Sequence, residues 1–255
     1  MNISVVTVCF NSEAGIARTI ESFLAQDHPD REMLVIDGGS RDRTVEIARS
    51  YRSDMIRLVS EPDRGLYDAM NKGLRLFAGD AVGFLNSDDC FHDASVLGRV
   101  SDAMADADAV YGDVAMMSAA DRGRVVRQWN SGTFRPGAFR WGWMPPHPAF
   151  YIRRELALAV GEFDLRYRIA ADYDFMLRTM EIRKPRVRYV PYPFVDFVLG
   201  GVSNASAGGI ARSSLESLAS RRQHLGAPPV DLALFLKPLR KLPQFLKARR
   251  ARKAE

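Results

Sequence analysis

The chain has 255 residues, of which 47% are hydrophobic and 26% are charged. This length suits an α/β domain of about 200 residues with an appendage, and the composition excludes fibrous, collagen-like and wholly disordered chains. The net charge is +5, but residues 237–255 hold eight Lys or Arg and one Glu, a net of +7, so the remainder carries −2. The basic character belongs to the C-terminal segment, and the main body lacks the charge of a nucleic-acid surface.

The two cysteines, Cys9 and Cys90, have no CxxC spacing, which excludes a disulfide scaffold and a cysteine-based zinc site and fits a reducing compartment. No apolar stretch approaches the roughly 18 residues that cross a bilayer. The first eight residues predict a strand, because this apolar run lacks the positive region and cleavage site of a signal peptide. We therefore expect a cytoplasmic protein.

Short apolar runs alternate with helical patterns over the first hundred residues. Strands are predicted at 3–8, 32–37, 55–59 and 81–85, and helices at 12–25, 44–51 and 67–77. Strands that alternate with such helices are typical of crossover connections and a mostly parallel sheet. The predicted fold is therefore α/β and Rossmann-like, with helices flanking the sheet.

The periodicity weakens between residues 113 and 143, where only 125–126 look like a strand. Further strands are predicted at 149–152 and 187–190, and helices at 154–160, 172–180 and 213–224. Two prolines at 228 and 229 predict a boundary. We expect one domain over residues 1–226, with a nucleotide-binding half over 1–112 and an acceptor and catalytic half over 113–226. A basic amphipathic tail would occupy residues 227–255.

Polar side chains follow each of the first four predicted strands. They are Asn11, then Asp37, then Glu61 and Asp63, and finally Asn86, Asp88 and Asp89. Ligands of parallel sheets bind beyond the carboxyl ends of the strands, so these residues predict a site at one edge. The adjacent carboxylates of Asp88 and Asp89 repel each other, and a bound Mg²⁺ or Mn²⁺ would relieve that cost. The alternative is an Asx turn or the N-cap of a helix over 90–100.

Five short motifs stand in order along residues 1–205. They are Thr7–Asn11 (TVCFN), Val35–Ser40 (VIDGGS), Asp63–Gly73 (DRGLYDAMNKG), Phe84–Asp89 (FLNSDD) and Ala171–Asp174 (ADYD). Their order and spacing resemble those of family 2 glycosyltransferases with the GT-A fold. The resemblance implies transfer of a sugar, such as a hexosyl group, from a nucleotide diphosphate donor, most often a UDP-sugar, with inversion at the anomeric carbon. The pathway it implies is bacterial surface polysaccharide synthesis.

The resemblance also implies roles for individual residues. Asp172 would be the base that accepts the proton of the acceptor hydroxyl, and its alternative role is to cap the helix that follows. Asp88 would bind the Mn²⁺ or Mg²⁺ that bridges the diphosphate, and Asp89 would support it. The residues expected to bind the nucleotide and the donor sugar are Thr7, Asn11, Asp37, Gly38, Ser40, Asp63, Asp68, Asn71, Lys72 and Ser87.

Three positions depart from the family pattern. Asn86 replaces the first acid of the usual Asp-x-Asp, Ala171 replaces the Glu of Glu-Asp, and Met70 stands where many members carry Arg. The metal-bound acid is retained, whereas a partner of the base and a cation near the diphosphate are lost. The alternative for the cation is its replacement by Lys72 or Arg64. These departures leave the donor sugar open.

Aromatic and glycine-rich segments provide candidate contacts to the acceptor or donor. Trp141, Trp143 and His147 precede a predicted strand. The tryptophan rings would stack on sugar faces or, alternatively, fill the core, and His147 would contact the donor phosphate or the acceptor or, alternatively, be a structural histidine. Gly201 and Ser203 belong to a GGVSN loop that would close over the diphosphate or form a plain turn. The Gln-x-x-Arg-Trp motif of processive members is absent from the sequence, so we expect addition of a single sugar residue.

The tail interleaves apolar and basic residues over 230–247, a mixture that suits anionic lipid headgroups; the alternative is a solvated basic end. We expect a peripheral enzyme at the inner face of the cell membrane, with a lipid-linked or saccharide acceptor and no nucleic-acid partner. Two other functions stay open here. One is a sugar-phosphate nucleotidyltransferase, which would normally carry a Gly-rich basic loop after the first strand. The other is a non-enzymatic protein whose tail binds a membrane or RNA.

Overall fold

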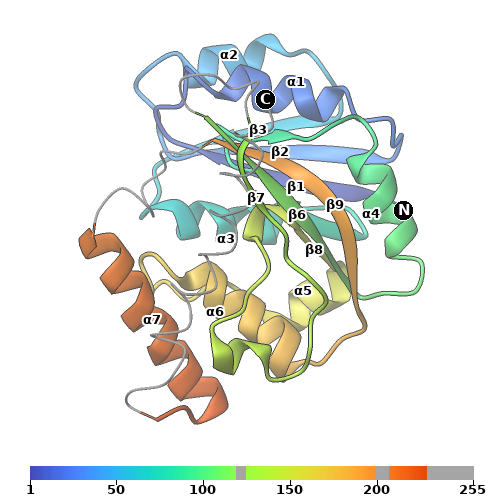
Figure 1. Ribbon diagram of the computed structural model, residues 1–255. Helices are drawn as coiled ribbons and strands as arrows, with labels where there is room; N and C mark the ends of the chain where they lie inside the picture. Colours follow the sequence, from blue (N-terminus) through green and yellow to red (C-terminus); the bar gives the residue numbers. More distant parts are fainter. Residues whose placement is uncertain (119–124, 199–206, 229–255) are drawn as a thin grey trace.

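The computed structural model describes residues 1–118, 125–198 and 207–228. Within these ranges nine strands form one sheet in the order β3-β2-β1-β4-β8-β6-β9-β5, with β7 paired to β6 (Figure 1). The strands are β1 Ile3–Cys9, β2 Arg31–Asp37, β3 Ile56–Ser60, β4 Ala81–Phe84, β5 Cys90–Phe91, β6 Ala109–Met117, β7 Val125–Trp129, β8 Phe150–Arg153 and β9 Val187–Val198.

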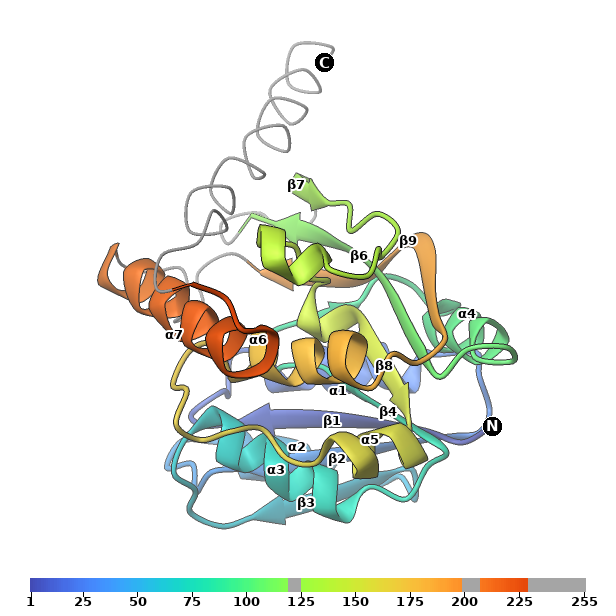
Figure 2. The same ribbon diagram turned by 90° about the horizontal axis from the view of Figure 1, so that it is seen from below.

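Helices cover both faces of the sheet and make a three-layer α/β/α architecture (Figures 1 and 2). The α-helices are α1 Ile16–Leu24, α2 Thr44–Ser50, α3 Leu66–Leu76, α4 Val96–Ala103, α5 Arg154–Val160, α6 Ala171–Leu177 and α7 Ala207–Leu225. Two 3₁₀ turns, η1 Ala138–Trp141 and η2 His147–Ala149, and one π turn, η3 Arg178–Ile182, complete the set. One core contains apolar side chains of α1, α2 and α4, and the other contains those of α3, α5 and α6.

The first four strands run parallel, as predicted: β1 pairs with β2 and β4, and β2 pairs with β3. The sheet as a whole is mixed, because β8 lies antiparallel between β4 and β6. Because β8 is antiparallel to both β4 and β6, β6 runs in the same direction as β4, and so does β9, the parallel partner of β6. The loops after β1, β2, β3 and β4 and the C-terminal ends of β6 and β9 therefore all lie at one edge.

Three elements differ from the sequence prediction. The strand β6 was not predicted, because Gly112 and Asp113 interrupt its apolar pattern. The prediction for β9 ended at residue 190, whereas the strand continues through Pro191 and Pro193, where a register shift against β6 accommodates them. The helix expected over 90–100 begins at Val96, and residues 90–91 instead form β5, which pairs with β9.

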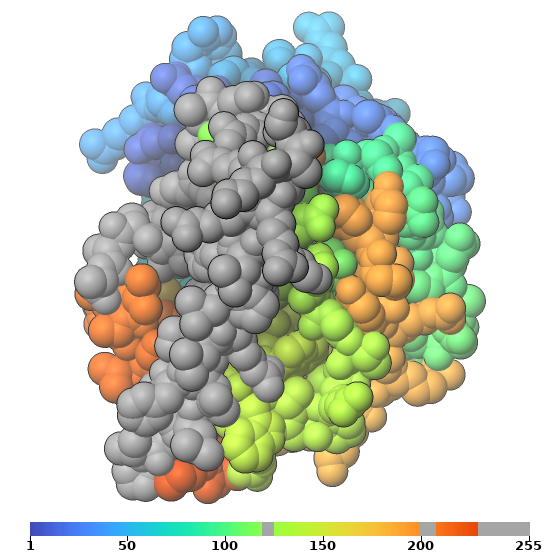
Figure 3. Space-filling model, in the orientation of Figure 1, coloured from blue at the N-terminus to red at the C-terminus, as the bar shows by residue number. Residues whose placement is uncertain are grey.

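The second half of the chain supplies β8 and β9 of this sheet and the helices α5, α6 and α7. Figure 2 shows α7 lying along α6, at the side of the molecule away from α4. Side chains of β9 form part of the surface on the face shown in Figure 3, in keeping with the partial exposure of most of this strand. Among the helices of the described ranges, none has the length and apolar character needed to cross a membrane.

Candidate active site

Hydrogen bonds tie together the loops at the carboxyl edge of the sheet. The main-chain N–H of Asn11 donates to Ser40 Oγ (2.8 Å), and Asn11 Oδ1 accepts from the N–H of Arg41 (3.0 Å). Asn11 has a φ of +50°, a left-handed conformation that Asn tolerates better than most residues. Ser87 Oγ donates to Ser12 Oγ (2.8 Å), which connects the loop after β4 to the loop after β1. The structure therefore brings the predicted donor residues Asn11, Ser40 and Ser87 to one edge.

Asp37 is fully buried at the end of β2, and internal donors surround its carboxylate. It accepts hydrogen bonds from the Ser40 hydroxyl, from Ser60 Oγ (2.7 Å) and from the N–H of Gly39 (3.1 Å). Burial by itself raises the pKa of Asp37, but these hydrogen bonds outweigh it and hold the pKa below its ordinary value. Asp37 thus fixes the loop after β2, and its contact with a nucleotide stays a prediction.

Two glycines allow neighbouring loops to approach closely. A Cβ on Gly38 would lie 2.3 Å from Asp63 Oδ2, so these two predicted donor residues are in contact. A Cβ on Gly15 would lie 2.5 Å from the carbonyl oxygen of Ser87 and 3.1 Å from the Cα of Asp88. The start of α1 therefore packs directly against the turn that presents Asp88, and larger side chains at either glycine would force the loops apart.

The predicted donor residues of α3 have internal partners. Asp68 accepts from the N–H of Arg64 (3.0 Å) and from its Nη2 (2.9 Å), and the hydrogen bond to this guanidinium lowers the pKa of Asp68. Lys72 Nζ pairs with Glu61 Oε1 (2.9 Å), on the loop after β3. Both side chains therefore brace the corner between β3 and α3.

Thr7 and Asn71 lie in the interior. Asn71 is 1% exposed and bonds the main chain of Phe163 in both directions, through Nδ2 to the carbonyl (3.0 Å) and from the N–H to Oδ1 (2.8 Å). Thr7 on β1 is fully buried, and its Oγ1 has no hydrogen-bond partner in the described part of the chain. Neither side chain reaches the surface of the edge in this structure.

Asp88 and Asp89 have opposite environments. Asp88 is exposed, and its carboxylate has no hydrogen bond or ion pair within the described ranges. Asp89 is fully buried and accepts from the N–H of Val198 and from Asn86 Nδ2, both at 3.3 Å. Burial, and secondly the charge of Asp88, raise the pKa of Asp89 well above its ordinary value. The N-cap alternative for this pair is wrong, because the next helix begins only at Val96.

The Asp88 turn fits a hard divalent cation that is shared with a bound diphosphate. Mg²⁺ and similar cations in nucleotide sites take one or two carboxylates together with phosphate oxygens. Within the described residues, no group of three or more His, Cys, Asp or Glu side chains could hold a metal ion. The free carboxylate of Asp88 therefore suits a cation that takes its other ligands from the substrate, and the buried Asp89 anchors the turn.

Asp172 lies half-buried in the first turn of α6, against the start of α3. Its Oδ1 accepts from the N–H of Tyr173 (2.7 Å) and lies 3.3 Å from the hydroxyl oxygen of Tyr67. That hydroxyl donates its proton to the carbonyl of Ile169 (2.7 Å). Burial and secondly the Asp172 charge raise the pKa of Tyr67 well above its ordinary value, so the phenol stays protonated. Tyr67 belongs to the DRGLYDAMNKG motif, but no role was predicted for it.

His147 packs behind the strand that leads into the Asp88 turn. Its ring stacks on Phe84 (5.1 Å between centroids) and meets Phe163 edge-on (5.6 Å), and Phe84 ends β4 just before the turn. Burial lowers the pKa of His147, and the nearby Asp172 carboxylate acts in the opposite direction. Its Nε2 is buried without a hydrogen-bond partner among the described residues. His147 is therefore a core residue whose ring lies within electrostatic range of the Asp172 carboxylate.

The two predicted tryptophans differ. Trp143 donates through Nε1 to the carbonyl of Ser131 (2.9 Å) and packs edge-on against Tyr111 (5.8 Å), which agrees with the core alternative. Trp141 is 49% exposed and stays a candidate for contact with a sugar. Two further predicted contacts lie outside the described residues, namely Gly201 and Ser203.

Cavities elsewhere do not coincide with this edge. One of about 300 Å³ lies between β6, β7 and β9, beside Asp113 and Tyr189. Another of about 400 Å³ is lined by Arg153 and Arg183 among others. Neither is lined by Asp88 or Asp172.

A mixed sheet whose parallel strands end in polar loops at one edge, together with an acid in the first turn of a helix, is the arrangement expected of a GT-A glycosyltransferase. The chain belongs to the family described as Glycosyl transferase family 2, whose model matches residues 4–163. It is 33% identical over 208 residues to a PGL/p-HBAD biosynthesis glycosyltransferase of Mycobacterium bovis, covering 79% of this chain and 78% of that protein. It is also 33% identical over 189 residues to an uncharacterized glycosyltransferase of Mycobacterium tuberculosis, with 72% and 70% covered.

Two solved structures share the fold. A mannosyltransferase of Pyrobaculum calidifontis, in complex with GDP-Man and Mn²⁺, has a TM-score of 0.68 at 19% identity and covers 99% of this chain and 75% of its own. TarS 1-349 of S. aureus, in complex with UDP-GlcNAc, has a TM-score of 0.67 at 17% identity, with 97% and 79% covered. These similarities confirm the predicted GT-A fold, and the family match confirms that the protein is a glycosyltransferase.

Proposed function

We propose that the protein transfers one sugar residue from a nucleotide diphosphate sugar, most simply a UDP-sugar, to a hydroxyl of a lipid-linked or saccharide acceptor, with inversion at the anomeric carbon. The product would be a unit of a bacterial surface polysaccharide or glycolipid. The relatives named for PGL/p-HBAD biosynthesis support a biosynthetic role. Residues 1–112 would bind the donor, and residues 113–226 would bind the acceptor and carry the base.

The observation that carries this proposal is the link between the Asp88 turn and Asp172. His147 stacks on Phe84 at the end of β4 and also lies close enough to Asp172 to interact electrostatically with it. An exposed carboxylate suited to a cation and a second carboxylate suited to accept a proton would therefore lie in one region of the surface. A single displacement needs these two groups on opposite sides of the reacting carbon.

The proposed reaction is a single displacement at the anomeric carbon of the donor sugar. The acceptor hydroxyl oxygen attacks the anomeric carbon while the bond from that carbon to the β-phosphate oxygen breaks. Asp172 accepts the hydroxyl proton, and the nucleoside diphosphate leaves. Asp88 would hold a Mg²⁺ or Mn²⁺ ion, whose chemistry would be to supply positive charge where negative charge develops on the leaving group. The loops after β1, β2 and β3 would orient the donor, with Asn11, Ser40 and Asp63 as the nearest candidates.

An Asp172→Asn variant tests the base. The amide keeps an oxygen for the Tyr173 N–H but cannot accept the proton, so we expect transfer to fall at least 100-fold, or roughly 3 kcal/mol, while nucleotide binding is unchanged. Asp164→Asn is the matched control, because Asp164 precedes the same helix but pairs with Arg166 at the surface. Equal transfer by both variants would rule out Asp172 as the base.

Thermal unfolding with a nucleotide panel tests the donor class. We expect UDP with Mn²⁺ or Mg²⁺ to raise Tm, because a ligand that binds only the folded state stabilises it. Asp88→Asn should abolish the metal-dependent part of the shift and leave the Tm of the ligand-free protein unchanged, since Asp88 is exposed without a described partner. A larger shift with GDP than with UDP would reassign the donor, and no shift with any nucleotide diphosphate would count against the proposal.

A further inference from the structure

The turn that precedes Asp172 is held by a carboxylate from the end of the described chain. Glu216 of α7 accepts hydrogen bonds through Oε2 from the N–H groups of Ile169 (2.8 Å) and Ala170 (3.0 Å). Its side chain is only 13% exposed. Ala170 is the N-cap of α6 and has no side-chain oxygen to cap the helix itself. Glu216 therefore replaces a local cap with one that comes from another helix.

A second contact reaches the same turn from α3. The Tyr67 hydroxyl donates to the Ile169 carbonyl at 2.7 Å and lies 3.3 Å from Asp172 Oδ1. Burial is the first reason for the high pKa of Tyr67, and the carboxylates of Asp172 and Glu216 raise it further. The two acids thus act on one phenol. The N–H groups of the turn and its Ile169 carbonyl are therefore all hydrogen-bonded, which restrains the backbone that leads into Asp172.

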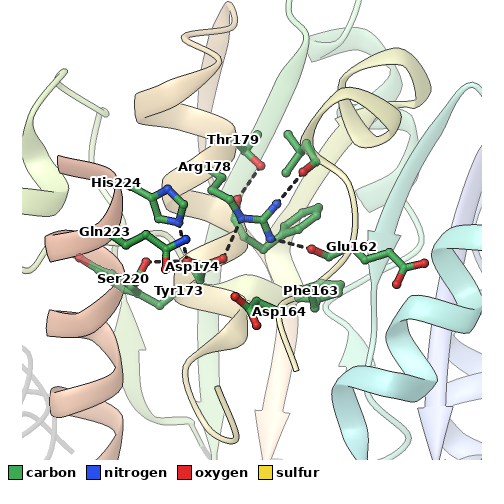
Figure 4. A network of polar contacts seen from close by, with 12 residues as sticks. Glu162, Phe163, Asp164, Tyr173, Asp174, Arg178, Thr179, Ser220, Gln223 and His224 are labelled. Atoms are coloured by element: carbon green, nitrogen blue, oxygen red, sulfur yellow. Dashed lines mark hydrogen bonds and ion pairs between the residues drawn. The ribbon is translucent and has the colours of Figure 1, made fainter. Parts of the chain in front are cut away.

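A buried polar network keeps α7 in place (Figure 4). Asp174, 1% exposed on α6, accepts from Arg178 Nε (2.7 Å) and Ser220 Oγ (2.7 Å), and the His224 ring nitrogen Nε2 lies 3.1 Å from it. Ser220 and His224 are one and two turns beyond Glu216 on α7. Any displacement of α7 would break these contacts, so the position of the Glu216 carboxylate is fixed relative to α6.

We propose that Glu216 is a positioning residue for Asp172, acting through the main chain of residues 169–170, with Tyr67 as the second support. This rests on the proposed role of Asp172 as the base. Ala171 stands where the family pattern has an acid beside the base, and α7 brings a carboxylate to the same turn. A displacement of about 1 Å at a reacting group can cost 100-fold in rate, so loss of this support should slow transfer without affecting donor binding.

Three variants of α7 test the proposal. Glu216→Ala should lower kcat about 10- to 100-fold, with KM for the donor and Kd for UDP within about twofold of the wild type. Glu216→Gln should restore most of the rate, because an amide oxygen still accepts from both N–H groups. Arg212→Ala is the matched control: it removes the 3.3 Å surface ion pair with Glu216 but leaves both main-chain hydrogen bonds.

The split between kcat and nucleotide binding separates positioning from stability. Tyr67 of α3 supports the same turn through its hydrogen bond to the Ile169 carbonyl. Tyr67→Phe removes that hydrogen bond, so we expect kcat to fall about 10-fold while the Kd for UDP is unchanged. A variant that only lowered Tm would keep the wild-type kcat at temperatures where it stays folded.

The outcomes divide clearly. A kcat of Glu216→Ala equal to that of Arg212→Ala would overturn the inference, and so would a Glu216→Gln variant as slow as Glu216→Ala. A Tyr67→Phe variant with the wild-type kcat would remove the second support. Full activity of Asp172→Asn would instead refute the proposed base, whatever the α7 variants do. Should Glu216→Ala fail to fold, the kcat values of Glu216→Gln and Tyr67→Phe still decide, because the inference requires a rate near that of the wild type for the first and a reduced rate for the second.

Discussion

At the scale of single residues, Asn86 beside Asp89 has a hydrogen-bonding capacity that the structure leaves unused. Asn86 Oδ1 is buried without a partner among the described residues, while its Nδ2 donates to Asp89. With Asp89→Asn, a rotated Asn86 amide could accept from the new side-chain N–H, and the buried acid would be gone. We expect the free energy of unfolding at pH 7 to stay the same or rise by about 1 kcal/mol, measured by urea denaturation. A loss above about 1 kcal/mol would mean that the carboxylate itself is needed.

For Asp37 we expect the opposite, namely that replacing the carboxylate by an amide destabilises the folded state. Its hydrogen bonds from Ser40, Ser60 and Gly39 lower its pKa in the folded state relative to the unfolded value of about 3.9. A depressed carboxyl pKa stabilises the folded state fully above the unfolded pKa, and the contribution is lost as the pH falls through the folded pKa. Asp37→Asn should therefore cost about 1–3 kcal/mol at pH 7 and less below pH 4. Denaturation at pH 7 and pH 3 measures both; an equal cost at the two values would contradict the charge argument.

The sequence was sufficient to place residues that immediately follow a strand, because strand ends fix their position in a parallel sheet. Asn11, Ser40 and Asp88 lie at the predicted edge for that reason. Partners that are distant along the chain could not be predicted. Tyr67 meets Asp172 across 105 residues, and Glu216 caps a turn 46 and 47 residues before it. No periodic pattern encodes such pairs.

At the scale of elements, local pattern and packing agree over the first parallel strands and in α5, which has its predicted bounds of 154–160. They disagree in β6, where a close contact with β9 requires glycine at position 112. A Cβ at Gly112 would lie 2.6 Å from the ring of Phe194, so the strand carries a glycine that weakens its own signal. The length of β9 was likewise concealed by prolines that only its pairing with β6 accommodates.

The contact between α6 and α7 should be a large stabilising element. Asp174→Ala leaves Arg178 without its buried partner and removes acceptors for Ser220 and His224. Removal of one member of a buried ion pair costs about 3–5 kcal/mol, so we expect a marked fall in Tm by calorimetry. Arg43→Ala is the control, because its ion pair with Glu46 is exposed and should contribute no more than about 0.5 kcal/mol. Similar Tm values for the two variants would show that the network is dispensable.

At the scale of the whole molecule, charge is separated along the chain. Residues 237–255 carry +7 and the rest −2, so we propose that this tail, which lies outside the described residues, brings the enzyme to an anionic membrane. Each basic residue near such a surface contributes about 1 kcal/mol. Deleting 237–255 should abolish sedimentation with phosphatidylglycerol vesicles at 0.1 M salt and leave UDP binding intact. Neutral vesicles are the control, and binding that survives the deletion would place the membrane contact elsewhere.

The pairing of β6 with β9 extends the folding unit beyond the residues that the family model matches. The family model stops at residue 163, whereas β9, which covers one side of β6 from Ala109 to Met117, starts at Val187. A fragment cut at that limit would leave a long apolar strand with an open flank, prone to self-association, and would also discard the helix that bears Asp172. The limit of the family model is thus not a limit of the folding unit, and genes trimmed to it should yield aggregated, inactive protein.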